Sequence, residues 1–358
     1  MSAERPRVVV DCRWIGLGGI GRVTEMLVSG IRERPGACEW VLWGHPRNAH
    51  LAGGVVDWVD ERSDPRRRFG QAGRTRIPQG DVTVFMCQTR PLALRHPCVV
   101  VVCDTIQVDF APGRLSRALR RFYLRRSART AGAVLTISQQ SRDDIVRVLG
   151  VDPVRIGMLR IHGLPRPPVH TADAARRGDL LYVGSLAPHK NVPFLIRSFA
   201  RTAFAAAGGT LHLVGGDAHD VDALRESLPT AISGQVHIEG RVTDHDLERA
   251  FAQADALVQA SLAEGFGLPA HEARLRGLPL CHSGRGAMAD ITGDDIRVFD
   301  PTDEASAARA IDAAIAAGRR DRGWTRWRRA MRAEAPGGVG DLADDVARAA
   351  RLALGGAP

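Results

Sequence analysis

The stretch 257-LVQASLAEGFGLPAHEARLRGLPL-280 joins an apolar run to a helix through a glycine-rich loop. Residues 256–259 are a short apolar run bounded by small and polar residues, which predicts a buried strand. Pro269 is favoured in the first turn of a helix and Gly277 is a typical stop, so we predict a helix over 270–276. Strand, glycine loop and helix in this order are typical of an α/β protein with a parallel sheet.

Short β-branched runs alternate with helix-length segments in both halves of the chain, and the halves begin alike, with RVVVDCRWIGLGGIGRVTEML at 7–27 and LLYVGSLAPHKNVPFLIRSF at 180–199. Prolines and small polar residues at 162–179 predict a linker. We therefore expect two doubly wound domains, 1–165 and 166–335, facing each other across a cleft, with a helix in 336–358 that packs back on the first domain. The expected strands are 7–10, 40–43, 82–86, 98–103, 133–137, 180–184, 210–214, 236–238, 256–259, 279–282 and 297–299.

The bulk composition describes a soluble globular protein. The chain has 358 residues, 44% of them hydrophobic and 25% charged. No apolar run approaches the ~20 residues that a membrane-spanning helix needs, and the N-terminus lacks the apolar core of a signal peptide, so we expect a cytoplasmic protein. The six cysteines show neither a C-x-x-C pair nor the spacing of a zinc site, and they are expected to be reduced core residues.

The formal charge of +9 comes almost entirely from arginine, because Lys190 is the only lysine in the chain. This charge has two interpretations, a solvated surface or attraction to phosphates, lipid or nucleic acid. The sequence offers no aromatic platform or recognition motif, so we expect no nucleic-acid partner. In 114-RLSRALRRFYLRRSAR-129 the arginines and the apolar Leu115, Leu119 and Phe122 lie on different helical faces. An ordinary surface helix with this apolar stripe buried and peripheral docking on anionic lipid both fit that pattern.

The loop 11-DCRWIGLGGIGRVTEML-27 contains Gly16, Gly18 and Gly21 at the spacing of a dinucleotide fingerprint. That fingerprint needs its first glycine directly behind the strand, but four residues separate Asp11 from Gly16 here. It also needs an acid at the end of the second strand to bind ribose hydroxyls, and the second expected strand ends without one. The sequence therefore argues against an NAD or FAD site. It leaves a loop for another anionic ligand, or a loop that only turns the chain.

The start of the helix after Pro269 is an expected anion site. Backbone amides at Gly267, Leu268 and Ala270 should point out of this helix start, where a diphosphate fits. Glu264 and Glu272 fall on either side of it. Carboxylates repel phosphates but accept hydrogen bonds from hydroxyl groups, so they predict hydroxyls on both sides of the diphosphate. A nucleotide sugar has this arrangement.

Lys190 follows the expected strand 180–184 and directly precedes Asn191, which can cap the next helix. In a chain that otherwise uses arginine, a single lysine at a helix start indicates a compact positive charge for a phosphate. The alternative is an exposed lysine without a ligand.

Together these motifs resemble the retaining glycosyltransferases of family 4, which have the GT-B fold of two Rossmann-like domains. The resemblance runs along nearly the whole chain. It is carried by GGIGR at 18–22, LTISQQSRDDI at 135–145, YVGSLAPHKN at 182–191, GRVTDHDLERAFAQADALVQASLAEGFGLPAHEA at 240–273 and FDPTDEAS at 299–306. The pair Glu264 and Glu272 is its most specific part.

The resemblance implies that Glu272 binds the ribose of a nucleotide-sugar donor and that Glu264 binds the transferred sugar. Lys190 and the helix start would bind the diphosphate, and residues 241–243 would face the base. The implied donor-binding residues are Gly18, Gly19, Ser185, Lys190, Arg241, Val242, Thr243, Glu264, Gly265, Phe266, Gly267, Leu268 and Glu272.

The implied activity is retaining transfer of a hexose from a nucleoside-diphosphate sugar to a hydroxyl of a glycan, lipid-linked or small-molecule acceptor, as in polysaccharide biosynthesis. Ser185, where family members often have arginine, resembles a subset of which several use GDP-mannose. Gly18 and Gly19 would close on the diphosphate or frame the acceptor. No protein nucleophile, metal or cofactor is implied. The resemblance implies that the leaving diphosphate helps to deprotonate the acceptor, while Lys190 and the helix start would stabilise its charge.

One departure from the family concerns catalysis. Family members usually have His-Asp after the fourth strand of the first domain, where this chain has Cys103 and Asp104. Asp104 or a neighbour takes over from the histidine, or the sugar is bound differently, so the catalytic candidates are Glu264, Lys190 and Asp104. The departure also keeps two alternatives open, a GT-B sugar-nucleotide epimerase and a non-catalytic sugar-nucleotide binder.

Overall fold

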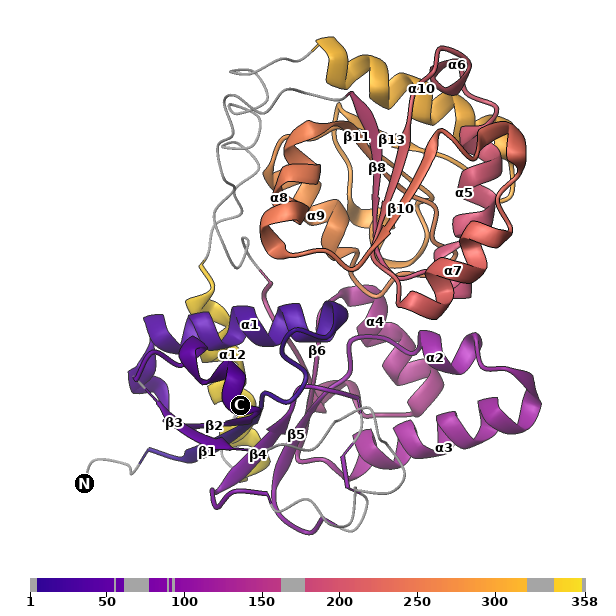
Figure 1. Cartoon of the computed structure of the whole chain (residues 1–358). Helices are drawn as coiled ribbons and strands as arrows, with labels where there is room; N and C mark the ends of the chain where they lie inside the picture. The colour runs from indigo at the N-terminus through magenta and orange to yellow at the C-terminus, as the bar shows by residue number, and fades with distance from the viewer. Residues whose placement is uncertain are drawn as a thin grey trace. The chain divides into compact units, whose positions relative to one another are not determined.

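The computed structural model describes residues 5–54, 56–60, 77–88, 90–91, 94–161, 178–320 and 338–355. Its internal contacts divide the chain into two compact units. Unit 1 consists of Met1–Pro165 together with Ala335–Pro358, and unit 2 consists of Arg166–Glu334. Each unit is built on one parallel sheet with helices against it (Figure 1).

The sheet of unit 1 has seven strands in the order β3-β2-β1-β4-β5-β6-β7. The strands are β1 (Arg7–Asp11), β2 (Glu39–Gly44), β3 (Asp57–Asp60), β4 (Val82–Phe85), β5 (Cys98–Val101), β6 (Ala133–Thr136) and β7 (Ile156–Met158). Every residue of β4, β5 and β6 is buried. Such continuous apolar strands are typical of a parallel sheet that is covered on both faces.

The helices of unit 1 are α1 (Gly18–Glu33), α2 (Ile106–Asp109), α3 (Gly113–Thr130), α4 (Gln139–Asp144) and α12 (Gly340–Ala353). A π-helical turn, Ile145–Leu149, continues α4, and 3-10 turns lie at Pro35–Ala37, Pro46–Leu51 and Pro153–Arg155. Helix α12 packs against α1 and against β4, β5 and β6. The contact with α1 is close, because a Cβ on Gly30 would lie only 2.0 Å from the carbonyl oxygen of Val339.

Helix α3 turns an apolar stripe toward solvent. Leu115, Leu119 and Phe122 are 85%, 58% and 61% exposed. The buried residues of the helix are Leu124, Ser127 and Ala128. The interpretation of 114–129 as a surface helix with its apolar stripe buried is therefore wrong, because the helical period places these three side chains opposite the face that packs on the unit.

The sheet of unit 2 has six strands in the order β10-β9-β8-β11-β12-β13. The strands are β8 (Asp179–Val183), β9 (Leu211–Val214), β10 (Val236–Gly240), β11 (Ala254–Gln259), β12 (Leu280–His282) and β13 (Ile296–Val298). The helices are α5 (Val192–Phe199), α6 (Ala203–Ala206), α7 (Ala218–Glu226), α8 (Asp244–Gln253), α9 (Leu268–Leu275) and α10 (Glu304–Arg320), with 3-10 turns at Pro188–Lys190, Thr230–Ile232 and Gly286–Asp290.

Both sheets have the same strand order when each unit is counted from its own first strand. The order is third, second, first, fourth, fifth and sixth, and unit 1 adds a seventh strand. This is the order of a doubly wound fold, so the predicted pair of Rossmann-like domains is confirmed. In such sheets the order reverses between the first and fourth strands, which are β1 and β4 in unit 1 and β8 and β11 in unit 2. Ligands bind outside the carboxyl ends of strands at this reversal.

No helix among the residues that the structure describes is long and apolar enough to cross a membrane.

Candidate functional site

Two loops meet in unit 2 where the strand order reverses. They follow β8 and β11. These two strands pair directly with each other, and Leu181 of β8 lies opposite Leu257 of β11. Two hydrogen bonds join them, since the side-chain amide of Gln259 donates to the carbonyl oxygen of Val183 at 2.9 Å and the Leu262 amide donates to that of His189 at 2.7 Å. Residues far apart in sequence are thereby held at one edge of the sheet.

The structure brings together the predicted Lys190 and Glu264 as an ion pair. The Nζ atom of Lys190 lies 2.8 Å from Oε1 and 2.6 Å from Oε2 of Glu264. The Lys190 side chain is 15% exposed and the Glu264 side chain 5%. Lys190 is therefore not the exposed lysine that the sequence left open. Removing either partner from such a buried pair leaves an uncompensated charge, which is strongly unfavourable.

Glycine backbone makes room for Glu264. A Cβ on Gly286 would lie 2.3 Å from the carbonyl oxygen of Glu264, and the φ angle of Gly286 is +62°, in the left-handed region that favours glycine. The next amide, that of Ala287, donates to the same carbonyl oxygen at 3.0 Å. The loop after β12 therefore fixes the main chain that carries the glutamate.

Helix α9 starts beside Glu264. Gly267 is its N-cap residue, with φ at +80°, and Pro269 lies in the first turn. The Ala270 amide donates to the carbonyl oxygen of Gly267 at 2.9 Å, so the prediction that this amide is free is wrong. The helix begins at Leu268, two residues before the predicted start, so the Ala270 amide already lies inside the first turn. We find no hydrogen bond from the amides of Gly267 and Leu268 within the described part of the chain, and these two remain for an anion.

Glu272 lies one turn into α9 and is 6% exposed. The adjoining helix α8 is joined to this turn by Arg276, whose guanidinium pairs with Glu248 of α8 and donates to the carbonyl oxygen of Glu272 at 2.9 Å. The same guanidinium stacks 4.5 Å above the ring of Phe251. Arg276 thus positions the helix segment that carries Glu272.

Two histidines beside the candidate residues are held neutral. Burial and the charge of Lys190 lower the pKa of His189 to about 4. Burial and the charge of Arg274 lower the pKa of His271 to about 4, and the His271 ring stacks on Phe266 at 4.3 Å. Neutral rings next to the helix start leave the positive charge there to Lys190.

Ser185 and Tyr182 shape the loop after β8. The Tyr182 hydroxyl donates to the carbonyl oxygen of Ser185 at 2.6 Å, and burial together with the charge of Glu264 raises the pKa of Tyr182. This bond leaves the Ser185 side chain at an exposed position.

The sequence predicts that Asn191 caps helix α5, but its side chain makes no capping hydrogen bond. Its backbone is left-handed, with φ at +58°, and its side-chain amide donates to the carbonyl oxygen of Pro301 at 3.1 Å. Asparagine tolerates this backbone conformation better than most other side chains, so the residue occupies the N-cap position through its backbone while its side chain bonds elsewhere.

The predicted base-facing residues lie between β10 and α8. Thr243 is the N-cap of α8, and its hydroxyl accepts a hydrogen bond from the Asp246 amide at 3.1 Å. Val242 packs on the core beneath the helix, and Arg241 is exposed.

The remaining predicted residues belong to unit 1. Gly18 and Gly19 begin α1 and are exposed, and a side chain on Gly18 would meet no atom within 4 Å. Gly21 has a packing role, because its Cβ would lie 2.5 Å from the carbonyl oxygen of Trp14. Asp104 accepts a hydrogen bond from the Ile106 amide at 3.0 Å, at the start of α2. Its carboxylate therefore has a structural contact.

Sequence reasoning missed Gly286, Arg276 and His271. A lone glycine, arginine or histidine carries no spacing signal, and each matters only through a partner distant in sequence or one turn away on α9. No group of three histidine, cysteine, aspartate or glutamate residues within the described ranges is placed to hold a metal ion.

Comparisons with known proteins bear on the family and the fold. Residues 177–317 match the family model described as "Glycosyl transferases group 1", and residues 78–162 match "Glycosyl transferase 4-like domain". The chain is 29% identical over 213 residues to the O-antigen chain mannosyltransferase B of Escherichia coli, a match that covers 56% of this chain and 55% of that protein. The chain thus spans about half the length of this curated relative.

Two solved structures share the fold. The Anabaena HepE structure, in complex with UDP and glucose, superposes with a TM-score of 0.68 at 16% identity and covers 96% of this chain and 98% of its own. WaaG, a glycosyltransferase involved in lipopolysaccharide biosynthesis, superposes with a TM-score of 0.66 at 17% identity, over 98% and 100% of the two chains. With both sheets and both family models in agreement, the chain belongs to the group 1 glycosyltransferases of family 4, which have the GT-B fold.

Proposed function

We propose that the protein is a retaining glycosyltransferase that moves a hexose from a nucleoside-diphosphate sugar to a hydroxyl of a glycan, lipid-linked or small-molecule acceptor. The observation that carries the proposal is the buried pair of Lys190 and Glu264 beside the start of α9, where the strand order of unit 2 reverses. This part of unit 2 offers a cation and two amides that can bind phosphate, and carboxylates that can accept hydrogen bonds from hydroxyls.

In this mechanism the donor separates the two members of the ion pair. Lys190 and the amides of Gly267 and Leu268 bind the diphosphate and stabilise the negative charge that grows on it as the sugar leaves. Glu264 accepts hydrogen bonds from the sugar hydroxyls, and Glu272 from the ribose. The departing diphosphate helps to take the acceptor proton on the same face of the sugar, so the configuration is retained without a protein nucleophile.

GDP-mannose is the donor we favour. Ser185 is a small hydroxyl residue, as in the subset of the family that includes GDP-mannose enzymes. The E. coli relative is named a mannosyltransferase. The HepE complex contains UDP and makes a uridine donor the natural second choice.

The test of the function is a thermal-shift panel with UDP, GDP, dTDP and NAD. A ligand at 100 times its Kd adds about 2.7 kcal/mol to the unfolding free energy, which raises the melting temperature by several degrees. We expect one nucleoside diphosphate to do so, NAD to have no effect, and Glu272→Ala to abolish the shift. Glu226→Ala, on an exposed position of α7, is the matched control. No shift with any nucleoside diphosphate, or an unchanged shift in Glu272→Ala, contradicts the proposal.

Cys103, in place of the family histidine, gives the reason to keep a second function in the test. It is buried, and burial, the charge of Asp104 and nearby Cys87 raise the pKa of its thiol, so it is a poor proton carrier. A GT-B sugar-nucleotide epimerase or a non-catalytic binder would bind the same nucleotide. Incubation with the sugar donor of the stabilising nucleotide separates the three, because a binder leaves the donor intact, an epimerase changes the configuration of the sugar, and a transferase releases the nucleoside diphosphate with the unepimerised sugar or its glycoside.

We further propose that transfer needs no metal ion, because Lys190 and the start of α9 supply the charge that a metal supplies elsewhere. EDTA should leave the rate unchanged, and restoration of a lost rate by added Mg²⁺ or Mn²⁺ contradicts this.

Finally, we propose that α3 docks on anionic lipid, which suits a lipid-linked acceptor. Its solvent-facing stripe of Leu115, Leu119 and Phe122 is flanked by arginines, and the helix has no acidic residue. An exposed apolar face with basic flanks is the pattern of an interfacial helix.

A further inference from the structure

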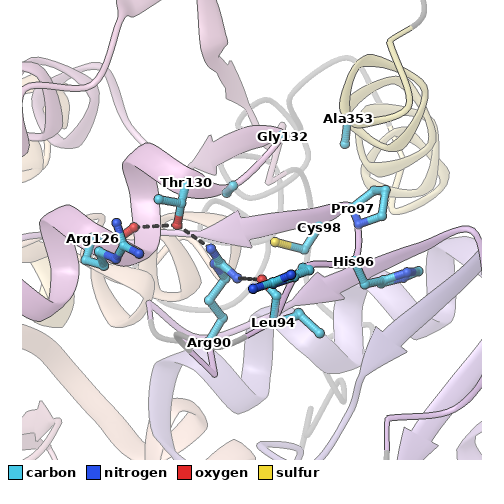
Figure 2. A pocket seen from close by; sticks show the side chains of 11 residues that line it. Arg90, Leu94, His96, Pro97, Cys98, Arg126, Thr130, Gly132 and Ala353 are labelled. Carbon is cyan, nitrogen blue, oxygen red and sulfur yellow. Dashed lines mark hydrogen bonds between the residues drawn. The ribbon is translucent and has the colours of Figure 1, made fainter.

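A cavity in unit 1 lies at the edge of the sheet opposite the carboxyl ends of its strands. It opens where β5 and β6 begin, between the last turn of α3 and the end of α12, and has a volume of about 650 Å³ (Figure 2). Cys98 of β5, Gly132 before β6 and Ala353 of α12 form part of its wall. None of the residues assigned above to donor or acceptor lines it. Its volume is that of a site for a small organic molecule.

The charge around this cavity is one-sided. Its wall contains Arg90, Arg95 and Arg126 together with His96, and no aspartate or glutamate is among the described residues that line it. Figure 2 shows the guanidinium of Arg90 between Thr130 and the carbonyl oxygen of Leu94. Three permanent cations around a hollow without a carboxylate attract an anion.

Arg90 is the decisive residue, because its charge is buried and no aspartate or glutamate of the described ranges pairs with it. It is 5% exposed. Its Nη1 atom donates to the carbonyl oxygens of Leu94 at 3.0 Å and Pro91 at 3.3 Å, and its Nη2 donates to the Thr130 hydroxyl. Its Nε atom is buried and has no hydrogen-bond partner in the part of the chain that the structure describes. A buried cation whose contacts are all neutral, with one donor unused, is unfavourable unless a ligand anion completes it.

The surroundings hold Arg90 in place for that role. The Tyr123 hydroxyl of α3 donates to the Arg90 carbonyl oxygen at 3.1 Å, and the Thr130 hydroxyl donates to that of Arg126 at 2.6 Å. Two turns of α3 therefore clamp the buried arginine. Arg95 and Arg126 are exposed, so they can move to meet a ligand.

We propose that this cavity binds a phosphate group, as a monoester or diphosphate carried by a larger molecule. Guanidinium groups match the geometry of phosphate oxygens. Arg90, Arg95 and Arg126 together provide more hydrogen-bond donors than the two oxygens of a carboxylate ligand can accept, which favours a phosphate. The volume leaves room for what the phosphate is attached to. Phosphate of this kind comes from a soluble metabolite or from a lipid headgroup. Arg126 lies one turn beyond Phe122 on the exposed face of α3, so a lipid headgroup is within reach of the same helix.

Calorimetric titration of the full chain with pyrophosphate tests the site. Arg126→Gln should weaken binding to the cavity by about tenfold or more, because a charge-assisted contact to phosphate is lost. Arg95→Gln should act in the same direction. Arg114→Gln removes an equal charge from the exposed start of the same helix, about 18 Å away, and should leave binding unchanged. Any pyrophosphate bound at the nucleotide site is common to all variants and does not enter the comparison.

Vesicle sedimentation separates the two sources. If the phosphate belongs to a lipid, phosphatidic acid vesicles bind more protein than phosphatidylglycerol vesicles of equal charge, and Arg126→Gln removes the difference. If the phosphate is soluble, the variants change pyrophosphate binding and the two vesicles bind alike. Equal pyrophosphate binding by Arg126→Gln, Arg95→Gln and Arg114→Gln, without a phosphatidic acid preference, overturns the proposal.

Discussion

At the scale of single residues, Lys190 and Glu264 satisfy each other in the absence of a ligand. The Nζ atom contacts both carboxylate oxygens, and little of either side chain reaches water. If the protein works as proposed, a donor diphosphate must compete with Glu264 for this lysine. The ion pair would then set the affinity for the nucleotide as well as the charge available for the reaction.

Opposite substitutions in the pair should have opposite effects on nucleotide binding. Lys190→Ala should abolish the thermal shift by nucleoside diphosphate, lower kcat/KM by about 10²–10³, and destabilise unit 2 by on the order of 3 kcal/mol. Glu264→Gln should bind the nucleoside diphosphate a few times more tightly, since Lys190 loses its competitor, yet transfer little sugar. Titration calorimetry and initial rates measure both.

Glu304→Gln is the control for this comparison, because it breaks an exposed ion pair with Arg197 in the same unit. Weaker nucleotide binding in Glu264→Gln, to the extent seen in Lys190→Ala, contradicts the competition between the pair and the donor.

Acid should destabilise unit 2 through His271. The pKa of this ring is lowered to about 4, below the 6.5 of an ordinary histidine. Between these values the unfolded chain takes up a proton that the folded chain does not, so the unfolding free energy is fully present above pH 6.5 and falls toward pH 4, by on the order of 2–3 kcal/mol for this ring. His271→Gln should flatten the pH dependence of the melting temperature. The matched His245→Gln, at an exposed position, should not.

The sequence was sufficient to propose Lys190, Glu264 and Glu272 as site residues, because their residue types and spacing stand out in a strand–loop–helix pattern. It did not reveal that Lys190 and Glu264 contact each other. That contact depends on β8 and β11 being neighbours, which is a property of the sheet. The Ala270 amide failed as a prediction because the position of the first helical residue decides which amides are free.

At the scale of elements, α3 carries three large apolar side chains on its solvent face. Replacing Leu119 and Phe122 by serine should lower binding to anionic vesicles by about a hundredfold or more, because each side chain loses on the order of 1.5–3 kcal/mol of burial in the lipid interface. The melting temperature should stay unchanged, since both side chains are exposed. Sedimentation at low and high salt measures the binding, and salt should weaken it for the wild type.

Val154→Ser is the control, because this side chain is 80% exposed in the same unit but outside α3. If it weakens vesicle binding as much as the α3 variant, or if none of the proteins binds vesicles, docking through α3 is contradicted.

Strands were predicted well where they are buried and apolar. β1, β4 and β11 lie within a residue or two of the predicted ranges. β3 and β7 were missed, because DWVD is largely exposed at the edge of the sheet and IGM is only three residues long. For α3 the helical period of the sequence showed which side chains share a face of the helix. It could not show which of these faces packs on the rest of unit 1.

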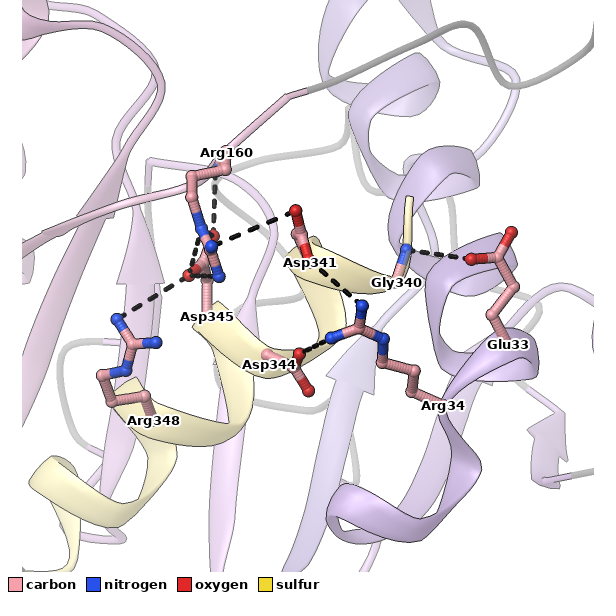
Figure 3. Close-up of polar contacts among 8 residues, drawn as sticks. All are labelled: Glu33, Arg34, Arg160, Gly340, Asp341, Asp344, Asp345 and Arg348. Carbon is pink, nitrogen blue, oxygen red and sulfur yellow. Dashed lines mark hydrogen bonds and ion pairs between the residues drawn. The ribbon is translucent and has the colours of Figure 1, made fainter. Parts of the chain in front are cut away.

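At the scale of the whole molecule, the C-terminal α12 is an integral part of unit 1. Asp345, which is 3% exposed, accepts from the Arg160 amide at 2.9 Å and from its guanidinium at 2.8 Å (Figure 3). Arg34 pairs with Asp341 and Asp344 of the same helix, and the Gly340 amide donates to Glu33 at 3.2 Å.

Gly30→Ala should destabilise unit 1 while leaving unit 2 unaffected. Its Cβ would collide with the Val339 carbonyl oxygen at the start of α12, and overpacking of this kind costs about 1–3 kcal/mol or more. Gly234→Ala adds a Cβ to open space in unit 2 and is the matched control. Calorimetric unfolding should show a lowered transition for unit 1 only, with the nucleotide-induced shift of unit 2 retained. An unchanged unfolding profile contradicts a close α1–α12 contact.

The alternation of strands and helices was enough to predict two doubly wound sheets. The ionic contacts of α12 were not predictable, because they join residues more than 180 positions apart, such as Arg160 and Asp345.

The position of α12 also has a consequence for how the protein is made. The strands of unit 1 are translated first, but the helix that covers β4, β5 and β6 is translated only after the whole of unit 2. At ordinary rates of synthesis, residues 166–339 take roughly 10–35 s to emerge. During that time the apolar face under α12 is uncovered. Unit 2 can therefore finish folding on the ribosome before unit 1, in the reverse of their order along the chain.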